Sequence, residues 1–347
     1  MDRVFFNKLL DTPSVSGFES GAANLYLDYL QPGMTATSVD VMGNAYAYLK
    51  GTGGENNKKF LIEAHIDEIG FQVIYVNDAG YVYVRRNGGV DLQCIPGSQV
   101  VIYTAAGEEI TGVIGKMPIH LVQPEERKKT IELDNLWIDT GLAPDEVKAR
   151  VSVGDVVAWK SNVVMIGNNR IASKGLDDKI GVFVVSQAMK RLAIADNRTA
   201  ADVWGVASVQ EEVGCRGAVV CGYKVAPDIA ISIDVDFATD VPCCSKQKFG
   251  DIALGKGVVV RRNLDTDSRL TSDIVRMAKD CGIPFQVSAC PMPTGGTNAA
   301  RIQLSRDGVR MLSLGIPCRY MHTPVEVCDM TDVEAAIDLV VQIVGKL

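Results

Sequence analysis

Short apolar runs alternate with segments of helical periodicity along the sequence, and this alternation limits the possible folds more than any other feature. Residues 60–64, 203–209 and 229–233 are largely apolar, as expected of short buried strands. Helical patterns follow Asp177 and Asp267. Strands that alternate with helices favour an α/β fold built on a sheet.

The last helix has the clearest predicted start. Thr331 and Glu334 have the spacing of a capping box, and an apolar stripe follows them. The stripe consists of Val333, Ile337, Val340, Val341 and Val344. This helix is predicted to cover one face of the sheet.

The pattern changes over residues 70–165, where short alternating runs such as 81–84 and 100–103 are separated by glycine-containing turns. This texture predicts a small β domain over 70–165. It would be inserted into an α/β domain formed by residues 1–69 and 166–347.

The composition disfavours several classes of protein. The chain has 347 residues, 47% of them hydrophobic, so it can bury a large core and is expected to form more than one domain. A formal net charge of -7 disfavours nucleic acid as a main partner. No apolar stretch approaches the roughly 20 residues that span a bilayer, and the first residues lack the apolar core of a signal peptide. We therefore expect a cytoplasmic protein that does not bind membranes.

The nine cysteines are interpreted as reduced thiols. Their number is odd, and no two have the Cys-x-x-Cys spacing of a zinc or redox motif. Most are predicted to be small buried hydrophobic residues. Cys215 is the least certain of them, because it lies beside an acidic pair.

Two of the three histidines lie near other potential metal ligands at the ends of apolar segments. His65 directly follows the run 60–64, and Asp67 lies two residues further on, on the same side of an extended chain. A carboxylate there can orient a metal-binding imidazole. His322 follows an apolar segment near the C-terminus. Alone, the pair His65 and Asp67 would fit an ordinary histidine and a surface aspartate equally well.

Carboxylates recur where the predicted strands end or a helix begins, which is where open α/β sheets build their sites. They are Asp177 and Asp178 at a helix start, Glu211 and Glu212 after the second strand, and Asp234 after the third. Asp177 alone could be a helix cap, and the glutamate pair a solvated turn. Asp234 is harder to explain in that way, because a carboxylate leaving an apolar strand needs a partner.

Together these groups suit two divalent cations about 3.5 to 4 Å apart, bridged by an aspartate. Such ions lower the pKa of a bound water to about 7. A carboxylate that is not a ligand must then take the water proton and return it to the leaving amine. Either Glu211 or Glu212 can do this while the other binds metal, and the pattern alone leaves the choice open.

Four motifs carry a resemblance to a known family. They are AHIDEIG at 64–70, LDDK at 176–179, QEEVG at 210–214 followed by RGA at 216–218, and YMHTPVE at 320–326. They resemble signatures of the glutamyl aminopeptidase family of metallopeptidases, which includes the tetrahedral TET aminopeptidases and some proteins named endoglucanases. The resemblance covers nearly the whole chain. It implies a mixed-sheet α/β catalytic domain with helices on both faces, plus an inserted domain like a small β-barrel.

The resemblance also implies a role for each site residue. The implied ligands of two divalent ions, most simply Zn²⁺ or Co²⁺, are His65 and Asp234 for one, Glu212 and His322 for the other, and Asp177 for both. Glu211 would be the general base. Asp67 would hold the His65 imidazole in the tautomer that exposes a nitrogen to metal. Asp178 is left without a ligand role and is expected to cap the helix.

The implied activity is the removal of residues from the free amino end of peptides. The substrate amine would dock on one ion and a nearby carboxylate, which places the first carbonyl against the other ion. The family also implies self-assembly into a hollow tetrahedral dodecamer that admits small peptides. The side chain preferred at the cleaved end is left open.

Two features depart from the family pattern. The glycine-rich stretch 293–299 has Asn298 where the family usually has aspartate, which puts substrate contacts in doubt but not the metal centre. The segment 116–120 is less rich in proline than its counterpart in relatives. His120 at its end is interpreted as structural or interfacial.

Three other functions compete with an aminopeptidase. A deacylase could use the same two ions on N-acylated amino acids or peptides. A glycosidase would need two opposed carboxyl groups roughly 5 to 9.5 Å apart, and the acids here are better explained as ligands. The third is a metal-binding or scaffold protein without catalysis, and the presence of all five ligands together with the base argues against lost catalysis.

Overall fold

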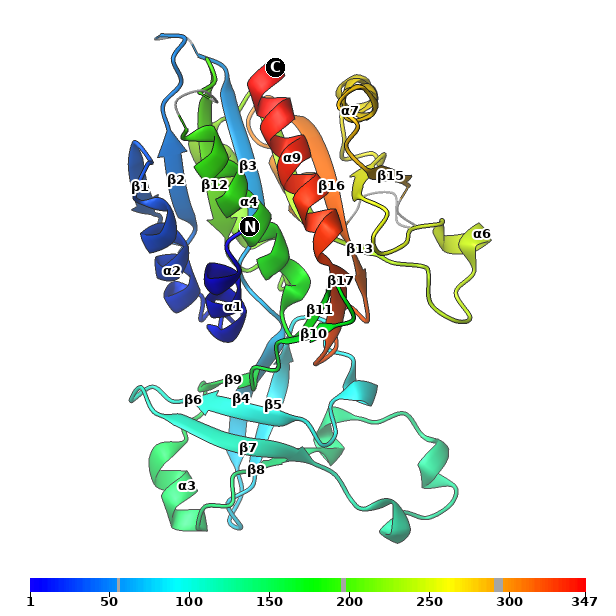
Figure 1. Cartoon of the computed structure of the whole chain (residues 1–347). Coiled ribbons are helices and arrows are strands. Elements are labelled where there is room, and N and C mark those ends of the chain that lie inside the picture. The colour runs from blue at the N-terminus through cyan, green and yellow to red at the C-terminus, as the bar shows by residue number, and fades with distance from the viewer. Residues whose placement is uncertain (55–56, 195–197, 290–295) are drawn as a thin grey trace.

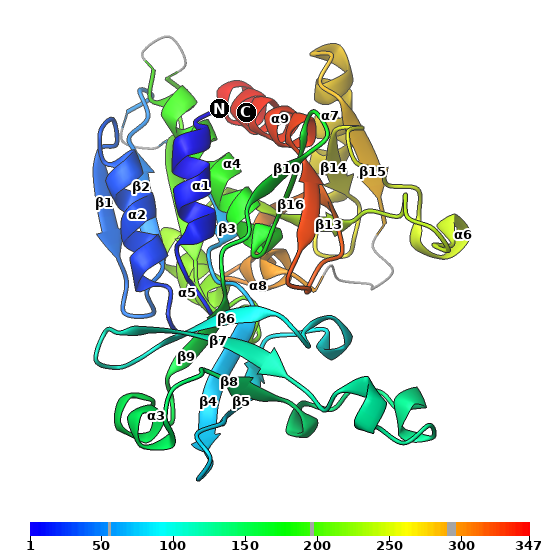
Figure 2. The same cartoon turned by 60° about the horizontal axis from the view of Figure 1, so that its bottom comes forward.

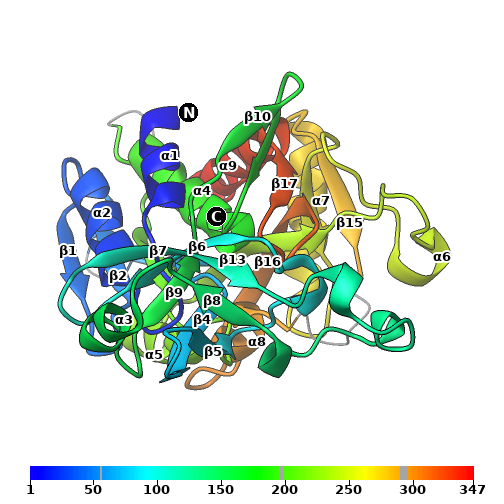
Figure 3. The same cartoon turned by 90° about the horizontal axis from the view of Figure 1, so that it is seen from below.

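The computed structural model describes residues 1–54, 57–194, 198–289 and 296–347. These residues form a large α/β part and a smaller β-barrel that lies across one end of it (Figures 1 and 2). Seen from the barrel side, the barrel strands lie in front of the α/β part (Figure 3). The predicted fold class is therefore confirmed, including the mixed sheet and the inserted barrel.

Eleven strands of the described chain form one mixed sheet. They are β1 (Ala36–Val39), β2 (Ala45–Leu49), β3 (Lys59–His65), β10 (Val164–Ile166), β11 (Arg170–Ser173), β12 (Asp202–Ser208), β13 (Ile229–Phe237), β14 (Val258–Arg261), β15 (Phe285–Ser288), β16 (Arg310–Arg319) and β17 (Glu326–Asp329). The central strands β12, β3, β13 and β16 are parallel. The predicted strands are the first three of these, and burial on both faces explains why they are nearly continuously apolar.

Helices cover both faces of the sheet (Figures 1 and 2). They are α1 (Arg3–Asp11), α2 (Ser20–Leu30), α4 (Leu176–Leu192), α7 (Ser268–Asp280) and α9 (Met330–Lys346) on one face, and α5 (Arg216–Val225) and α8 (Asn298–Gln303) on the other. The α4 helix packs against the sheet and against α1, α2 and α9. It is buried along nearly its whole length, as expected of a helix enclosed by other elements. A short helix, α6 (Lys246–Phe249), lies to one side.

The last helix covers the sheet as predicted, but it starts earlier than the predicted capping box. Its cap is Asp329, whose carboxylate accepts a hydrogen bond from the Thr331 amide at 3.0 Å. Glu334 instead forms an ion pair with Arg191 of α4. An aspartate two residues upstream of Thr331 thus accepts a free amide of the first turn, so a cap at Thr331 is not needed.

The barrel is closed by the strands β4 (Gly70–Val76), β5 (Val82–Asn87), β8 (Trp137–Asp139), β7 (Glu109–Gly115), β6 (Gln99–Tyr103) and β9 (Val156–Trp159), in that order. It carries one helix, α3 (Pro144–Arg150). Alternate residues of β7, such as Ile110 and Ile114, point into its own hydrophobic core. Since β10 already belongs to the large sheet, the barrel itself ends by Trp159.

The chain enters the barrel directly from β3, so the carboxyl end of this central strand faces the barrel (Figure 1). Because β12, β13 and β16 run parallel to β3, their carboxyl ends meet at the same edge. Over the described residues, no helix is long and apolar enough to cross a membrane.

Candidate functional site

The residues singled out from the sequence gather at the sheet edge that faces the barrel. His65 is the last residue of β3, and Asp234 lies on the neighbouring strand β13. Glu211 and Glu212 follow β12, whose last residue pairs with His65. The remaining two are Asp177 at the start of α4 and His322 in the turn between β16 and β17.

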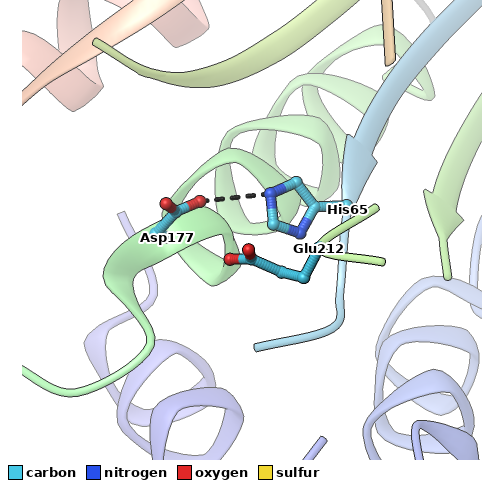
Figure 4. Close-up of side chains that lie close together, drawn as sticks. All are labelled: His65, Asp177 and Glu212. Atoms are coloured by element: carbon cyan, nitrogen blue, oxygen red, sulfur yellow. Dashed lines mark hydrogen bonds and ion pairs between the residues drawn. The ribbon is translucent and has the colours of Figure 1, made fainter. Parts of the chain in front are cut away.

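The carboxylate of Asp177 lies between the two histidines. Its Oδ1 is 3.1 Å from Nε2 of His65, and its Oδ2 is 3.4 Å from Nε2 of His322. Figure 4 shows the first of these contacts, with the Glu212 side chain beside it. Glu212 Oε2 is 3.4 Å from the same nitrogen of His322, and Asp234 Oδ1 is 3.8 Å from that of His65. Each histidine therefore has its own second carboxylate, and Asp177 is shared.

This donor set fits divalent cations of the borderline type. Potential ligand atoms of His65, Asp177 and Glu212 all lie within 4.8 Å of one another, and so do those of His65, Asp178 and Asp234. Imidazole nitrogens combined with carboxylate oxygens suit zinc or cobalt. Glu212 Oε1 is buried without a hydrogen-bond partner in the described part of the chain, so it has a free acceptor for a cation.

The electrostatics of the cluster point the same way. Burial raises the pKa of Glu212 well above its usual range, and repulsion from Asp177 adds to this effect. Burial lowers the pKa of His65, but hydrogen bonds to Asp177 and Asp234 outweigh it and raise that pKa well above its usual value. The surroundings thus favour added positive charge at this point, which bound cations supply.

Asp67 lies beside His65 and approaches its imidazole with both its main chain and its side chain. The Nδ1 of His65 lies 3.0 Å from the main-chain carbonyl of Asp67, whereas the nearest carboxylate oxygen is 3.5 Å away. The carboxylate accepts hydrogen bonds from the amides of Glu211 at 2.9 Å and Glu212 at 3.2 Å, and from the Ser16 hydroxyl at 2.7 Å. The Asp67 carbonyl therefore makes the shorter contact to the imidazole, while its carboxylate holds the loop of residues 210–215, here called the glutamate loop.

The glutamate loop is shaped by close main-chain packing. Gln210 and Cys215 both have positive φ angles, of 58° and 56°, and the Cys215 amide donates to the Glu211 carbonyl at 2.8 Å. A Cβ atom on Gly217 would lie 2.4 Å from both the Asn44 side chain and the Val209 carbonyl. Glycine is thus required where the loop enters α5.

Glu326 is a supporting residue to which the sequence analysis gave no role. Its Oε1 accepts a hydrogen bond from the His322 amide, and its Oε2 accepts one from the Asp177 amide, both at 3.0 Å. One buried carboxylate therefore ties together two segments that carry potential ligands. Its place at the start of an apolar strand, four residues after His322, was the available signal, but its second partner, Asp177, is distant in sequence.

The barrel segment also contacts the cluster. The carbonyl of Gly89 is 3.0 Å from Nδ1 of His322, which leaves Nε2 facing Asp177 and Glu212. A Cβ atom at position 89 would lie 2.8 Å from the imidazole. The absence of a side chain at Gly89 thus allows the barrel to approach His322, and Gly88 leaves room for Glu212 in the same way.

Asp178 has the capping role expected of it, because its Oδ1 accepts a hydrogen bond from the Gly181 amide at 3.1 Å. Its Oδ2 is buried and has no hydrogen-bond partner among the described residues.

A cavity of about 370 Å³ opens beside the cluster. Its wall combines the acidic residues with other side chains, both apolar and polar. These are Cys215, Val235, Phe237, Arg261, Thr297 and Met321. Arg261 is buried and pairs with Asp236 at 3.0 Å.

The two departures from the family pattern both lie outside this cavity wall. Asn298 sits behind it, where its amide nitrogen donates to Glu63 at 2.6 Å and to the Ser208 hydroxyl at 3.0 Å. Residues 293–295 of the same stretch lie outside the described residues. His120 is exposed on the long connection between β7 and β8.

The fold and the acidic cluster define a two-part α/β protein with a candidate metal centre at the carboxyl edge of its sheet. The profile of the M42 glutamyl aminopeptidase family matches residues 43–339. A lysyl aminopeptidase from Pyrococcus furiosus is 32% identical, over 100% of this chain and 98% of that protein. The chain belongs to the M42 family and is a peptidase.

Solved structures agree with this assignment. A TET aminopeptidase from Thaumarchaeota archaeon SCGC AB-539-E09 has a TM-score of 0.93 and 32% identity, covering 99% of this chain and 96% of that one. The TET1 peptidase of Pyrococcus horikoshii, which can assemble into a tetrahedron or a large octahedral shell, has a TM-score of 0.87 and 29% identity. That match covers 99% of each chain.

Proposed function

We propose that the chain is a metal-dependent aminopeptidase that removes residues from the free amino end of peptides with two divalent cations. The observation that carries this proposal is the position of Asp177, which presents one carboxylate oxygen to His65 and the other to His322. A carboxylate shared in this way is the expected bridge of a two-metal site.

The ligands fall into two groups around this bridge. His65 and Asp234 would hold one ion, and Glu212 and His322 the other. Zinc and cobalt both suit this set of ligands, and their selection depends on geometry and supply. When bound, two such ions polarise the scissile carbonyl and lower the pKa of an attacking water to about 7.

Glu211 is the proposed general base. It lines the cavity beside the ligands but lies in neither group of potential metal-binding atoms. Burial raises its pKa to about 8, which suits a carboxylate that accepts a proton from water and returns it to the leaving amine near neutral pH. Its main chain is fixed by the Asp67 carboxylate, which accepts the Glu211 amide at 2.9 Å.

The acidic lining of the cavity supports a free amine as the substrate group. Asp177, Asp234 and Glu212 line the cavity and are the proposed ligands, so the cations that they hold would face an incoming substrate. A free amine can bind such a cation through its nitrogen lone pair, whereas the lone pair of an acylated nitrogen is delocalised into its carbonyl. An N-acyl deacylase acting through the same centre is the function against which this proposal is tested.

The test is hydrolysis of matched peptides with free and acetylated amino ends, before and after chelation and after zinc or cobalt is restored. Chelator-sensitive cleavage of only the free-ended peptides is expected. Cleavage of only the acetylated peptides would replace the aminopeptidase with a deacylase.

Self-assembly is the second part of the proposal. We expect a homo-oligomer, with a tetrahedral dodecamer as the first candidate because a 29% identical peptidase can assemble into a tetrahedron. Residues 70–165 are proposed to act as an assembly or lid domain, and the protein is proposed to work in the cytoplasm on small peptides. A stable monomer in light scattering would contradict the assembly.

A further inference from the structure

Cys215 lies between the proposed base and the far wall of the cavity. Its Sγ is 3.2 Å from Oε1 of Glu211 and 3.9 Å from the carbonyl oxygen of Gly296. The thiol has one proton to donate, and the carboxylate oxygen is both nearer and more negative than the carbonyl. The S–H group is therefore directed at Glu211.

The main chain fixes this contact. The amide of Cys215 donates to the carbonyl of Glu211 at 2.8 Å, and the amide of Arg216 donates to that of Gln210 at 3.1 Å. The positive φ of Cys215, 56°, ends this tight turn and starts α5. Thiol and carboxylate are thus held on one closed loop.

The Glu211 side chain has few other restraints. In the described part of the chain, the thiol makes the only hydrogen bond to its carboxylate. A glutamate has three side-chain torsions, so a single donor decides much of its orientation. Burial and the nearby Glu211 charge raise the pKa of the thiol well above its usual range, so it stays protonated and remains a donor.

We propose that Cys215 is a positioning residue for catalysis, whose thiol orients the carboxylate of Glu211 for proton transfer. The inference rests on the proposed function, because it takes Glu211 to be the base. A thiol is a weak donor, so it can restrain the carboxylate while leaving an oxygen free to accept the proton. Cys215 touches the base, not the metal ligands, and acts through it.

The kinetic test compares Cys215→Ala, which removes the donor, with Cys215→Ser, which keeps one. In the metal-reconstituted protein, Cys215→Ala is expected to lower kcat about fivefold, or about 1 kcal/mol at 1.36 kcal/mol per tenfold, with KM changed less than about twofold. Cys215→Ser is expected to recover part of the loss. An unchanged kcat, or an effect on KM alone, would overturn the proposal.

The matched control is Cys221→Ala, the same truncation inside α5, the helix that Cys215 precedes. The Cys221 thiol is buried in the same hydrophobic cluster as Cys215, but it donates to the Ala218 carbonyl at 3.4 Å and not to Glu211. The Cys221→Ala variant should therefore keep an unchanged kcat. If both variants lower kcat equally, the loss reflects packing of α5 and the positioning role is wrong.

A second readout does not depend on turnover. The S–H stretching band of Cys215, isolated as the infrared difference between the native protein and Cys215→Ser, should lie at lower frequency than that of an unbonded thiol. Glu211→Gln should move it back toward higher frequency. A band at the unbonded frequency would overturn the inference, even if the enzyme is active. A shifted band in an inactive protein would show that the contact exists, and only the proposed function would then be wrong.

Discussion

At the scale of single residues, neighbouring acids in the site have different surroundings, and these suit the different roles proposed for them. Asp177 contacts both histidines, whose hydrogen bonds outweigh burial and lower its pKa below the usual range. Glu211 has no histidine within ion-pair distance among the described residues, and burial raises its pKa to about 8. The first environment suits a permanent anion that binds cations, and the second a group that exchanges a proton.

This difference predicts opposite effects for two isosteric changes. Glu211→Gln should reduce kcat at least about 100-fold with nearly normal metal content, because it removes only the proton acceptor. Asp177→Asn should lose metal, because it removes the shared anion. Steady-state kinetics and elemental analysis on the same preparations check both. A Glu211→Gln variant that stays active would refute the assignment of the base.

Histidine and carboxylate residues at the ends of apolar runs could be found from the sequence, because the carboxyl ends of parallel strands converge. His65, Asp177 and Glu212 lie close together for that reason. The partners of Asp67 could not be found in the same way. Its carboxylate bonds to amides 144 and 145 positions away, which no local spacing encodes.

At the scale of elements, Glu326 joins two segments that approach the site from different directions. Glu326→Gln keeps the size of the side chain but leaves a single acceptor oxygen, so either the His322 amide or the Asp177 amide loses its partner. We expect metal affinity to fall about 10- to 100-fold. Metal titration checks this, with Glu334→Gln on the surface of α9 as the control. Equal affinity in both variants would show that Glu326 does not support the ligands.

The barrel contributes directly to the site through Gly89. Gly89→Ala should displace the His322 imidazole, since the new Cβ would start 2.8 Å from Nδ1. Binding of the cation proposed at His322 should be weakened while the fold is kept. The control is Gly345→Ala, where the added methyl meets nothing within 4 Å. Normal metal content and activity in Gly89→Ala would mean that the barrel can shift without disturbing the histidine.

The start of the last helix shows a limit of local patterns. Thr331 and Glu334 have the right spacing for a capping box, yet Asp329 caps the helix and Glu334 pairs with Arg191. Two residues within three positions, Asp329 and Thr331, could each cap the helix. The ion pair of Glu334 with α4 depends on a residue far away in the sequence, so the local pattern does not predict it. The order of strands in the sheet likewise depends on long-range pairing.

At the scale of the whole molecule, bound cations should stabilise the native chain. The proposed ligands come from β3, β13, α4 and two loops, so they are brought together only in the folded state. At a free metal concentration 100 times Kd, one site contributes about 2.7 kcal/mol. Calorimetry should therefore show a lower unfolding temperature after chelation, restored by zinc or cobalt. An unfolding temperature that does not respond to metal would speak against a native metal centre.

The most direct test of the account is the cleavage of paired peptides that differ only in acetylation of the amino end. The account predicts that metal-loaded protein releases the first residue of the free peptide, that chelation stops this release, and that the acetylated partner stays intact. Cleavage of the acetylated peptide alone, or cleavage that persists after complete metal removal, would contradict it.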